Sequence, residues 1–193
     1  MFSRDLPWYA DPVKEMISRS FLILLLIFVL PYSASAETTP RVRVLDAHLK
    51  SLFDHGLTQS PTLRTLVDKV EASSILVFVD GDMRMPERFG AQTKFVTSVN
   101  DVRYVRVDIN VMLAPRRQIA LLAHELQHAL EIADRPEIQD IEAMESFYED
   151  VGFQSFDEGR HRGFETDAAL EMQEAVERDL GGRAPRAQAP AVY

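Results

Sequence analysis

The feature that most constrains this chain is the five-residue run H-E-L-Q-H at positions 124–128. It lies in a largely apolar stretch, residues 117–133, which has the pattern of a buried helix and contains no proline. Residues four apart on a helix share one face, so the imidazoles of His124 and His128 can reach a single metal ion. The carboxylate of Glu125 then lies beside the open coordination position. Buried histidines and acids are costly unless they are paired or coordinated, which favours a metal site over hydrogen-bonded core histidines.

The segment A-H-E-L-Q-H-A-L at residues 123–130 resembles the active-site helix of the zincin metallopeptidases, and the gluzincins most of all. It also resembles the helix of a group of small exported bacterial proteins. The zincin resemblance implies Zn²⁺ as the cofactor, His124 and His128 as its ligands, and Glu125 as the general base of peptide hydrolysis. In gluzincins the third ligand is a Glu from a later helix. The likeness covers one helix closely and the rest of the chain only through the order of its elements.

Helical geometry ranks the acidic candidates for the third ligand, which are Glu131, Glu142, Glu145, Glu149 and Glu165. Glu131 lies one turn beyond His128, so we expect it to support the site or to face solvent. The three glutamates at 142, 145 and 149 lie away from the apolar face of an expected helix over 136–151. On an expected helix over 164–180, Glu165 falls within the apolar stripe, where a carboxylate needs a partner such as a metal. Its alternative role is a first-turn acid favoured by the helix dipole.

A hydrolytic site also needs a hydrogen-bond donor for the developing oxyanion. The candidates are Tyr148, His161 and Tyr104, although Tyr148 also suits a core position and His161 also suits an exposed loop. The gluzincin pattern places an Asp four residues after its Glu ligand. This chain has Ala169 there, so the sequence identifies no supporting partner for His124.

Residues 1–36 have the layout of a secretory signal peptide. Arg19 precedes an apolar run at 21–30, and S-A-S-A at 33–36 ends in an A-x-A cleavage pattern. The apolar run is shorter than the roughly 20 residues that span a bilayer, which argues against an uncleaved anchor. We therefore expect an exported protein, periplasmic or extracellular, that meets a membrane only during export. The mixed charges before Met16 predict that Met16 is the true start.

Composition narrows the possible functions. The chain has no cysteine, which excludes thiol nucleophiles and cysteine-based zinc sites. Its net charge of −9 disfavours nucleic acid as a partner. The expected partner is a peptide or protein substrate, and nothing in the sequence indicates an oligomeric state.

The expected fold is α+β, a minimal zincin-like domain over 37–180 followed by a disordered tail at 181–193. Helices are expected at 44–55, ending at Gly56, and at 61–72, where Ser60 and Pro61 form a helix start. Strands are expected at 75–79, 93–99 and 103–113, with a turn at Asn100-Asp101 and a loop over 80–92. They would form a small antiparallel or mixed sheet against the active-site helix and further helices. Strand 103–113 is expected to hold an extended peptide by strand addition.

Two functions follow from these patterns. The leading one is an exported zinc-dependent peptidase, in which a metal-activated water hydrolyses peptide bonds. The alternative is a non-catalytic exported metal-binding or interaction protein on a zincin-like scaffold. A structural domain without metal is a further possibility, which metal analysis would separate from both.

Overall fold

The computed structural model describes residues 39–86, 89–155 and 163–181, which lie in one compact unit beginning at Thr39. The expected signal peptide, the start at Met16 and nearly all of the expected tail lie outside the described residues and stay predictions. The elements in chain order are β1 (Val42–Val44), α2 (Ala47–Gln59), α3 (Pro61–Glu71), β2 (Ile75–Asp82), β3 (Ala91–Val99), β4 (Val102–Asn110), α4 (Pro115–Ala133), α5 (Ile141–Val151), β5 (Phe153–Ser155), β6 (Gly163–Glu165) and α6 (Asp167–Leu180). The α+β class is confirmed.

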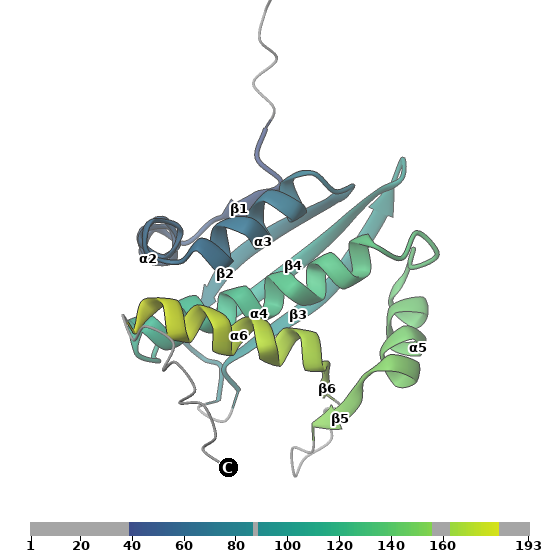
Figure 1. Cartoon of the computed structure of the whole chain (residues 1–193). Helices are drawn as coiled ribbons and strands as arrows, with labels where there is room; N and C mark the ends of the chain where they lie inside the picture. The colour runs from purple at the N-terminus through teal and green to yellow at the C-terminus, as the bar shows by residue number, and fades with distance from the viewer. Residues whose placement is uncertain (1–38, 87–88, 156–162, 182–193) are drawn as a thin grey trace, which may run out of the picture. The chain divides into compact units, whose positions relative to one another are not determined.

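The main sheet is mixed and has the strand order β1-β2-β4-β3. Strands β1, β2 and β4 are parallel, and β3 pairs antiparallel with β4 at one edge. The helix α4 packs on β2, β3 and β4, and α6 packs on α4 (Figure 1). The alternating apolar residues of β2 and β4 that meet this layer are fully buried, among them Val77, Val79, Val105, Val107 and Ile109. The core therefore lies between the sheet and α4.

The helix α4 is surrounded on nearly every side by α2, α3, α6 and the sheet. Pro115 stands at its start, where the missing backbone N–H costs nothing. The expected apolar helix at 117–133 thus forms, with two additional residues at its N-terminus. Because the helix is enclosed, polar residues in its centre must find partners inside the protein.

Several expected element ends are wrong. The helix expected from residue 44 begins at Ala47, and strands β2 and β3 extend into the expected loop 80–92, to Asp82 and from Ala91. The helix α2 does not stop at Gly56 but continues to Gln59. A Cβ atom at Gly56 would lie 2.8 Å from Ile119 Cγ2 and 2.9 Å from Leu63 Cδ2, so this glycine permits close helix packing. The strand β4 ends at Asn110 instead of continuing to residue 113. The side chain of Asn110 accepts a hydrogen bond from the backbone of Met112, which turns the chain toward α4.

The hairpin at Asn100-Asp101 is confirmed. Both residues have positive φ, 50° and 63°, as a two-residue type I′ turn between strands requires. The expected strand addition to residues 103–113 is wrong, because β4 lies inside the sheet, between β2 and β3. The edge strand next to α4 is β3, whose outer backbone groups are unpaired within this sheet.

The C-terminal helices begin later than expected. The helix α5 starts at Ile141, where the Asp140 side chain accepts from Ala143 N, and the preceding turn buries Ile138 in the core. The helix α6 starts at Asp167, capped by Thr166. Glu165 is the last residue of β6, not a residue in the first turn of a helix. The helical arguments for Glu165 therefore rested on the wrong element.

Among the helices of the described residues, none combines the length and apolarity needed to cross a membrane.

Candidate metal centre

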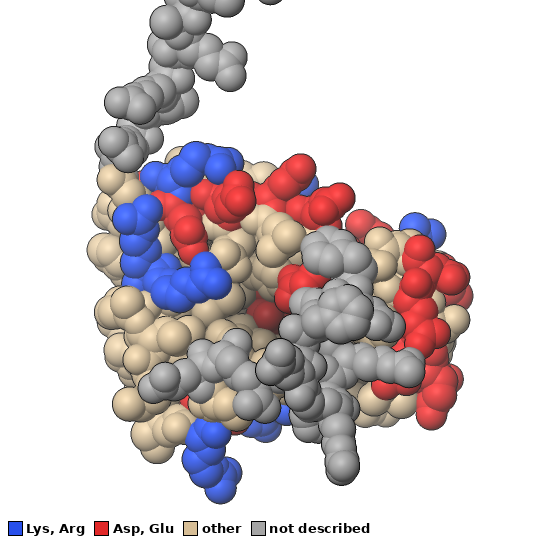
Figure 2. All heavy atoms as spheres, turned by 90° about the horizontal axis from the view of Figure 1, so that it is seen from below, with Lys and Arg blue, Asp and Glu red and all other residues tan. Residues whose placement is uncertain are grey.

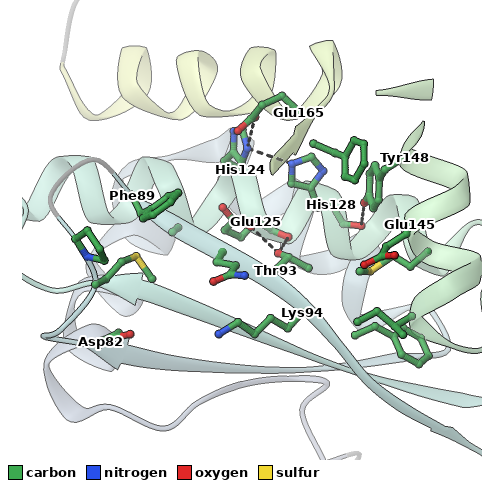
Figure 3. A pocket seen from close by; sticks show the side chains of 18 of the residues that line it. Asp82, Phe89, Thr93, Lys94, His124, Glu125, His128, Glu145, Tyr148 and Glu165 are labelled. Carbon is green, nitrogen blue, oxygen red and sulfur yellow. Dashed lines mark hydrogen bonds and ion pairs between the residues drawn. The ribbon is translucent and has the colours of Figure 1, made fainter. Parts of the chain in front are cut away.

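Three side chains from two distant parts of the chain converge beside α4. His124 and His128 lie one helical turn apart, and Glu165 reaches them from the end of β6 (Figure 3). One ligand atom from each of the three lies within 4.8 Å of the other two. The Nε2 atoms of the two histidines are 3.2 Å apart, and Glu165 Oε2 lies 2.9 Å from His124 Nε2. The three donors therefore face one common point.

The distances of 3.2 and 2.9 Å are close to those of a tetrahedral metal site. With Zn–N bonds of about 2.0–2.1 Å, adjacent ligand atoms of a tetrahedron are roughly 3.3 Å apart. Glu165 Oε2 is buried and makes no aligned hydrogen bond to any described residue, although His124 Nε2 is near. A buried carboxylate oxygen in this state is costly unless a cation accompanies it. The donor set of two imidazoles and one carboxylate is one that zinc accepts.

The electrostatics around the three donors favour ionised Glu165. Burial alone would raise the pKa of Glu165, but its contact with His124 and the nearby His128 hold that pKa below its usual value. The Nδ1 atom of His124 is buried and has no hydrogen-bond partner among the described residues. The sequence did not identify a supporting partner for His124, and the described part of the structure offers none to its Nδ1 atom.

His128, in contrast to His124, has a hydrogen-bond partner at its Nδ1 atom. His128 Nδ1 lies 2.9 Å from Glu131 Oε2. Burial opposes protonation of His128, but the bond to Glu131 and the nearby carboxylates of Glu125 and Glu165 outweigh it and raise the His128 pKa. Burial alone would raise the pKa of Glu131. Its bonds to His128, Thr166 and Tyr148 outweigh burial, so the Glu131 pKa is lowered. Glu131 thus supports the site, in one of the two roles expected for it.

Tyr148 is turned toward this supporting group. Its hydroxyl lies 3.2 Å from both the His128 carbonyl oxygen and Glu131 Oε2, and its ring meets the His128 ring edge-on. Burial and the neighbouring Glu131 carboxylate raise the pKa of Tyr148, so the phenol keeps its proton. With its proton directed to these two acceptors, Tyr148 supports His128 in this structure and does not point at the common point of the three donors.

Glu125 is buried between α4 and the edge strand. Thr93 Oγ1, on β3, donates a hydrogen bond of 2.6 Å to Glu125 Oε2. Burial raises the pKa of the Glu125 carboxyl, and the two histidines and Thr93 oppose this rise only in part. Glu125 is therefore a stronger base than an exposed glutamate and has a fixed orientation. Nothing in the sequence pointed to Thr93, which lies 32 residues from Glu125.

These residues open on a cleft of about 670 Å³. The segment after β2 bounds one end with Met85 and Phe89, and α5 and β6 bound the other with Ile141, Met144 and Phe164. Figure 3 shows Phe89 and Tyr148 on opposite sides of the His–Glu group. The face in Figure 2 is hollowed and has acidic atoms in the depth of the hollow. Acidic side chains also gather on the side where α5 lies (Figures 1 and 2).

The remaining sequence candidates do not join the three donors. Glu145 lines the cleft from α5 but is exposed and outside the ligand group, and neither Glu142 nor Glu149 lines the cleft. Tyr104, on β4, does not line the cleft either. His161 lies outside the described residues. A scan of family models, a search of curated proteins and a search of solved structures each found no significant match.

Proposed function

We propose that this protein is an exported zinc-dependent peptidase. The observation that carries the proposal is the convergence of His124, His128 and Glu165 next to a buried acid, Glu125, on the wall of an open cleft. Export is supported by the signal-peptide layout of residues 19–36. Zinc is supported by the donor set and by donor distances close to those of a tetrahedral site.

His124, His128 and Glu165 would hold the metal on the wall of the cleft. A bound zinc ion would polarise the carbonyl of the scissile peptide and lower the pKa of a water molecule to about 7. The carboxylate of Glu125 accepts a proton from the attacking water and then delivers it to the leaving amine nitrogen. Thr93 holds that carboxylate in place during both transfers.

The substrate backbone would bind along the edge strand β3. The outer N–H and C=O groups of β3, which no described strand pairs, can bond to an extended peptide, and the Thr93 hydrogen bond holds the strand next to Glu125. At the α5 end of the cleft, Ile141 is 47% exposed, and Met144 and Phe164 line the same end. An apolar substrate side chain would remove this surface from water. The favoured substrate is therefore an extended peptide with an apolar residue near the cleaved bond.

The test combines metal analysis with a cleavage assay on a mixed peptide library. Wild type purified without chelator should carry about one zinc per chain and cleave peptides. Glu125→Gln keeps the size of the side chain and should retain zinc while losing at least about a hundredfold in kcat. Glu165→Ala and His128→Ala should lose most of the zinc.

Two results would change the proposal. Full zinc content in Glu165→Ala would move the third ligand to another residue. Zinc-loaded wild type that cleaves no peptide would favour the non-catalytic metal-binding protein.

A further inference from the structure

Glu131 bonds both to His128 and to the residue that follows Glu165 in the chain. Its Oε2 atom lies 2.9 Å from His128 Nδ1, and its Oε1 atom accepts a 2.7 Å hydrogen bond from Thr166 Oγ1. Thr166 follows Glu165 directly in the chain. The Glu131 side chain is only 14% exposed. A single carboxylate thus contacts one candidate ligand and the residue next to another.

The first contact decides where His128 carries its proton. An ionised carboxylate only accepts hydrogen bonds, so the neutral imidazole facing it has its proton on Nδ1. The Nε2 atom of His128 then presents its lone pair toward His124 and Glu165, where a metal would bind. Tyr148 lies 3.2 Å from the same Glu131 oxygen and limits its movement.

The second contact holds the strand that carries Glu165. The strand β6 has three residues and, among the strands that the structure describes, pairs with β5 alone, in a two-stranded sheet separate from the main sheet. The main sheet therefore does not fix the position of Glu165. Thr166 caps α6 by accepting from Ala169 N and at the same time donates to Glu131 on α4. This bond ties the end of β6 to the helix of the two histidines.

We propose that Glu131 is a positioning residue that orients His128 and, through Thr166, sets the distance of Glu165 from the two histidines. The inference rests on the proposed metal centre but not on peptide cleavage. It assigns to Thr166, whose hydroxyl bonds to Glu131 and to Ala169 N, a measurable part in metal affinity.

The test measures Zn²⁺ affinity by competition with a chromophoric chelator, and the visible absorption of the Co²⁺-loaded protein, for folded variants. In Glu131→Gln the new amide can donate to Nδ1 and shift the His128 proton to Nε2, where it blocks the metal. Zinc affinity should fall about 10- to 100-fold, the usual effect of losing a group that supports a ligand. Thr166→Val should also weaken affinity and change the Co²⁺ spectrum, whereas Thr166→Ser keeps the hydroxyl and should behave like wild type.

Two controls separate positioning from general stability. Thr166→Val also loses a helix cap, so Asp46→Ala, which removes the equivalent cap of α2, provides the comparison. Asp46→Ala should lower thermal stability but leave zinc affinity and the Co²⁺ spectrum unchanged. Because Thr166 acts through Glu131, Glu131→Ala combined with Thr166→Val should bind zinc no more weakly than Glu131→Ala alone.

The proposal is overturned if Thr166→Val binds zinc as tightly as Thr166→Ser, or if Glu131→Gln keeps wild-type affinity and spectrum. A wild type that binds no zinc overturns both the metal centre and this coupling. If wild type binds zinc and the variants weaken it, but no peptide is cleaved, the positioning role stands and the peptidase function fails.

Discussion

At the scale of single residues, Thr93 provides a direct test of how the proposed base is held. Thr93→Val has nearly the same shape but lacks the hydroxyl that bonds to Glu125 Oε2 at 2.6 Å. A hydrogen bond to a charged group contributes about 1.5–3 kcal/mol, so kcat at saturating substrate should fall about ten- to a hundredfold. Thr93→Ser keeps the donor and should stay close to wild type. Zinc lost together with activity would show that Thr93 supports the metal centre instead of the base.

A substitution at Met144 tests whether the apolar end of the cleft binds a substrate side chain. Met144→Glu places a charge where an apolar substrate side chain is expected. For peptides with an apolar residue beside the cleaved bond, kcat/KM should fall about tenfold or more, and peptides with a basic residue there should gain. Met112→Glu is the matched control, because Met112 is 71% exposed and does not line the cleft. An unchanged cleavage pattern in Met144→Glu would place the substrate elsewhere.

At the scale of elements, Arg103 holds the C-terminal end of α4. Its guanidinium is buried and donates to the carbonyl oxygens of Ile132, Ala133 and Arg135. These carbonyls lie at or just beyond the end of the helix, where regular helical bonds run out, although Ile132 O also accepts from Arg135 N and Arg135 O from Ile138 N. Arg103, on β4, thus links the sheet to the helix that carries both histidines.

Arg103→Met should remove the side-chain donor of all three carbonyls, two of which keep a backbone donor, and lower the free energy of unfolding by about 2–4 kcal/mol. Urea denaturation at pH 7 measures this change. Arg103→Lys keeps the charge but not the branched donor geometry, so an intermediate loss is expected. If Arg103→Met unfolds at the wild-type urea concentration, the contact at the helix end contributes little to stability.

A second contact between elements makes stability depend on pH. Asp179 on α6 accepts hydrogen bonds from Ser60 Oγ and Thr62 N at the start of α3. Burial would raise the pKa of Asp179, but these bonds outweigh it and hold the pKa below its ordinary value of 3.8. A carboxyl whose pKa is lower in the folded state stabilises the protein above its unfolded pKa. That stabilisation disappears as the pH falls through the folded value.

Asp179→Ala should therefore cost about 1–2 kcal/mol at pH 7. The difference from wild type should stay constant down to about pH 5 and shrink as the pH falls below about 4. Urea midpoints at several pH values measure this, with Asp179→Asn as a variant that keeps an acceptor without the charge. A difference that does not change with pH would show that the ionised form contributes nothing beyond the hydrogen bonds.

At the scale of the whole molecule, the proposed metal centre joins α4 to the β6–α6 junction, so metal binding should stabilise the fold. A ligand present at a thousand times its Kd adds about 4 kcal/mol to the folded state. For a domain of this size, its removal should lower Tm by roughly 10 °C. Calorimetry with and without chelator measures the shift. His128→Ala should show no chelator dependence, and an unchanged wild-type Tm would argue against a structural contribution from metal.

What the sequence alone could predict depends on chemistry within about one helical turn or one hairpin. The spacing of His124 and His128 predicted a shared helix face, and Ser60-Pro61 and Asn100-Asp101 predicted a helix start and a turn. These features form where expected, because neighbouring residues determine their geometry. Gly56 led to a wrong helix end. A glycine stands there because α2 packs closely against Ile119, and the helix continues past it.

Only the tertiary structure decided how the site is completed. Glu165 was selected as an inward-facing residue of a helix, yet it lies at the end of a short strand and meets the histidines through the packing of α6 on α4. Thr93 reaches Glu125, and Thr166 reaches Glu131, across 32 and 35 residues of sequence. The choice of β3 as the edge strand likewise depends on the order in which strands pair. Contacts of this kind form when the chain buries its apolar faces together, so no local pattern in the sequence records them.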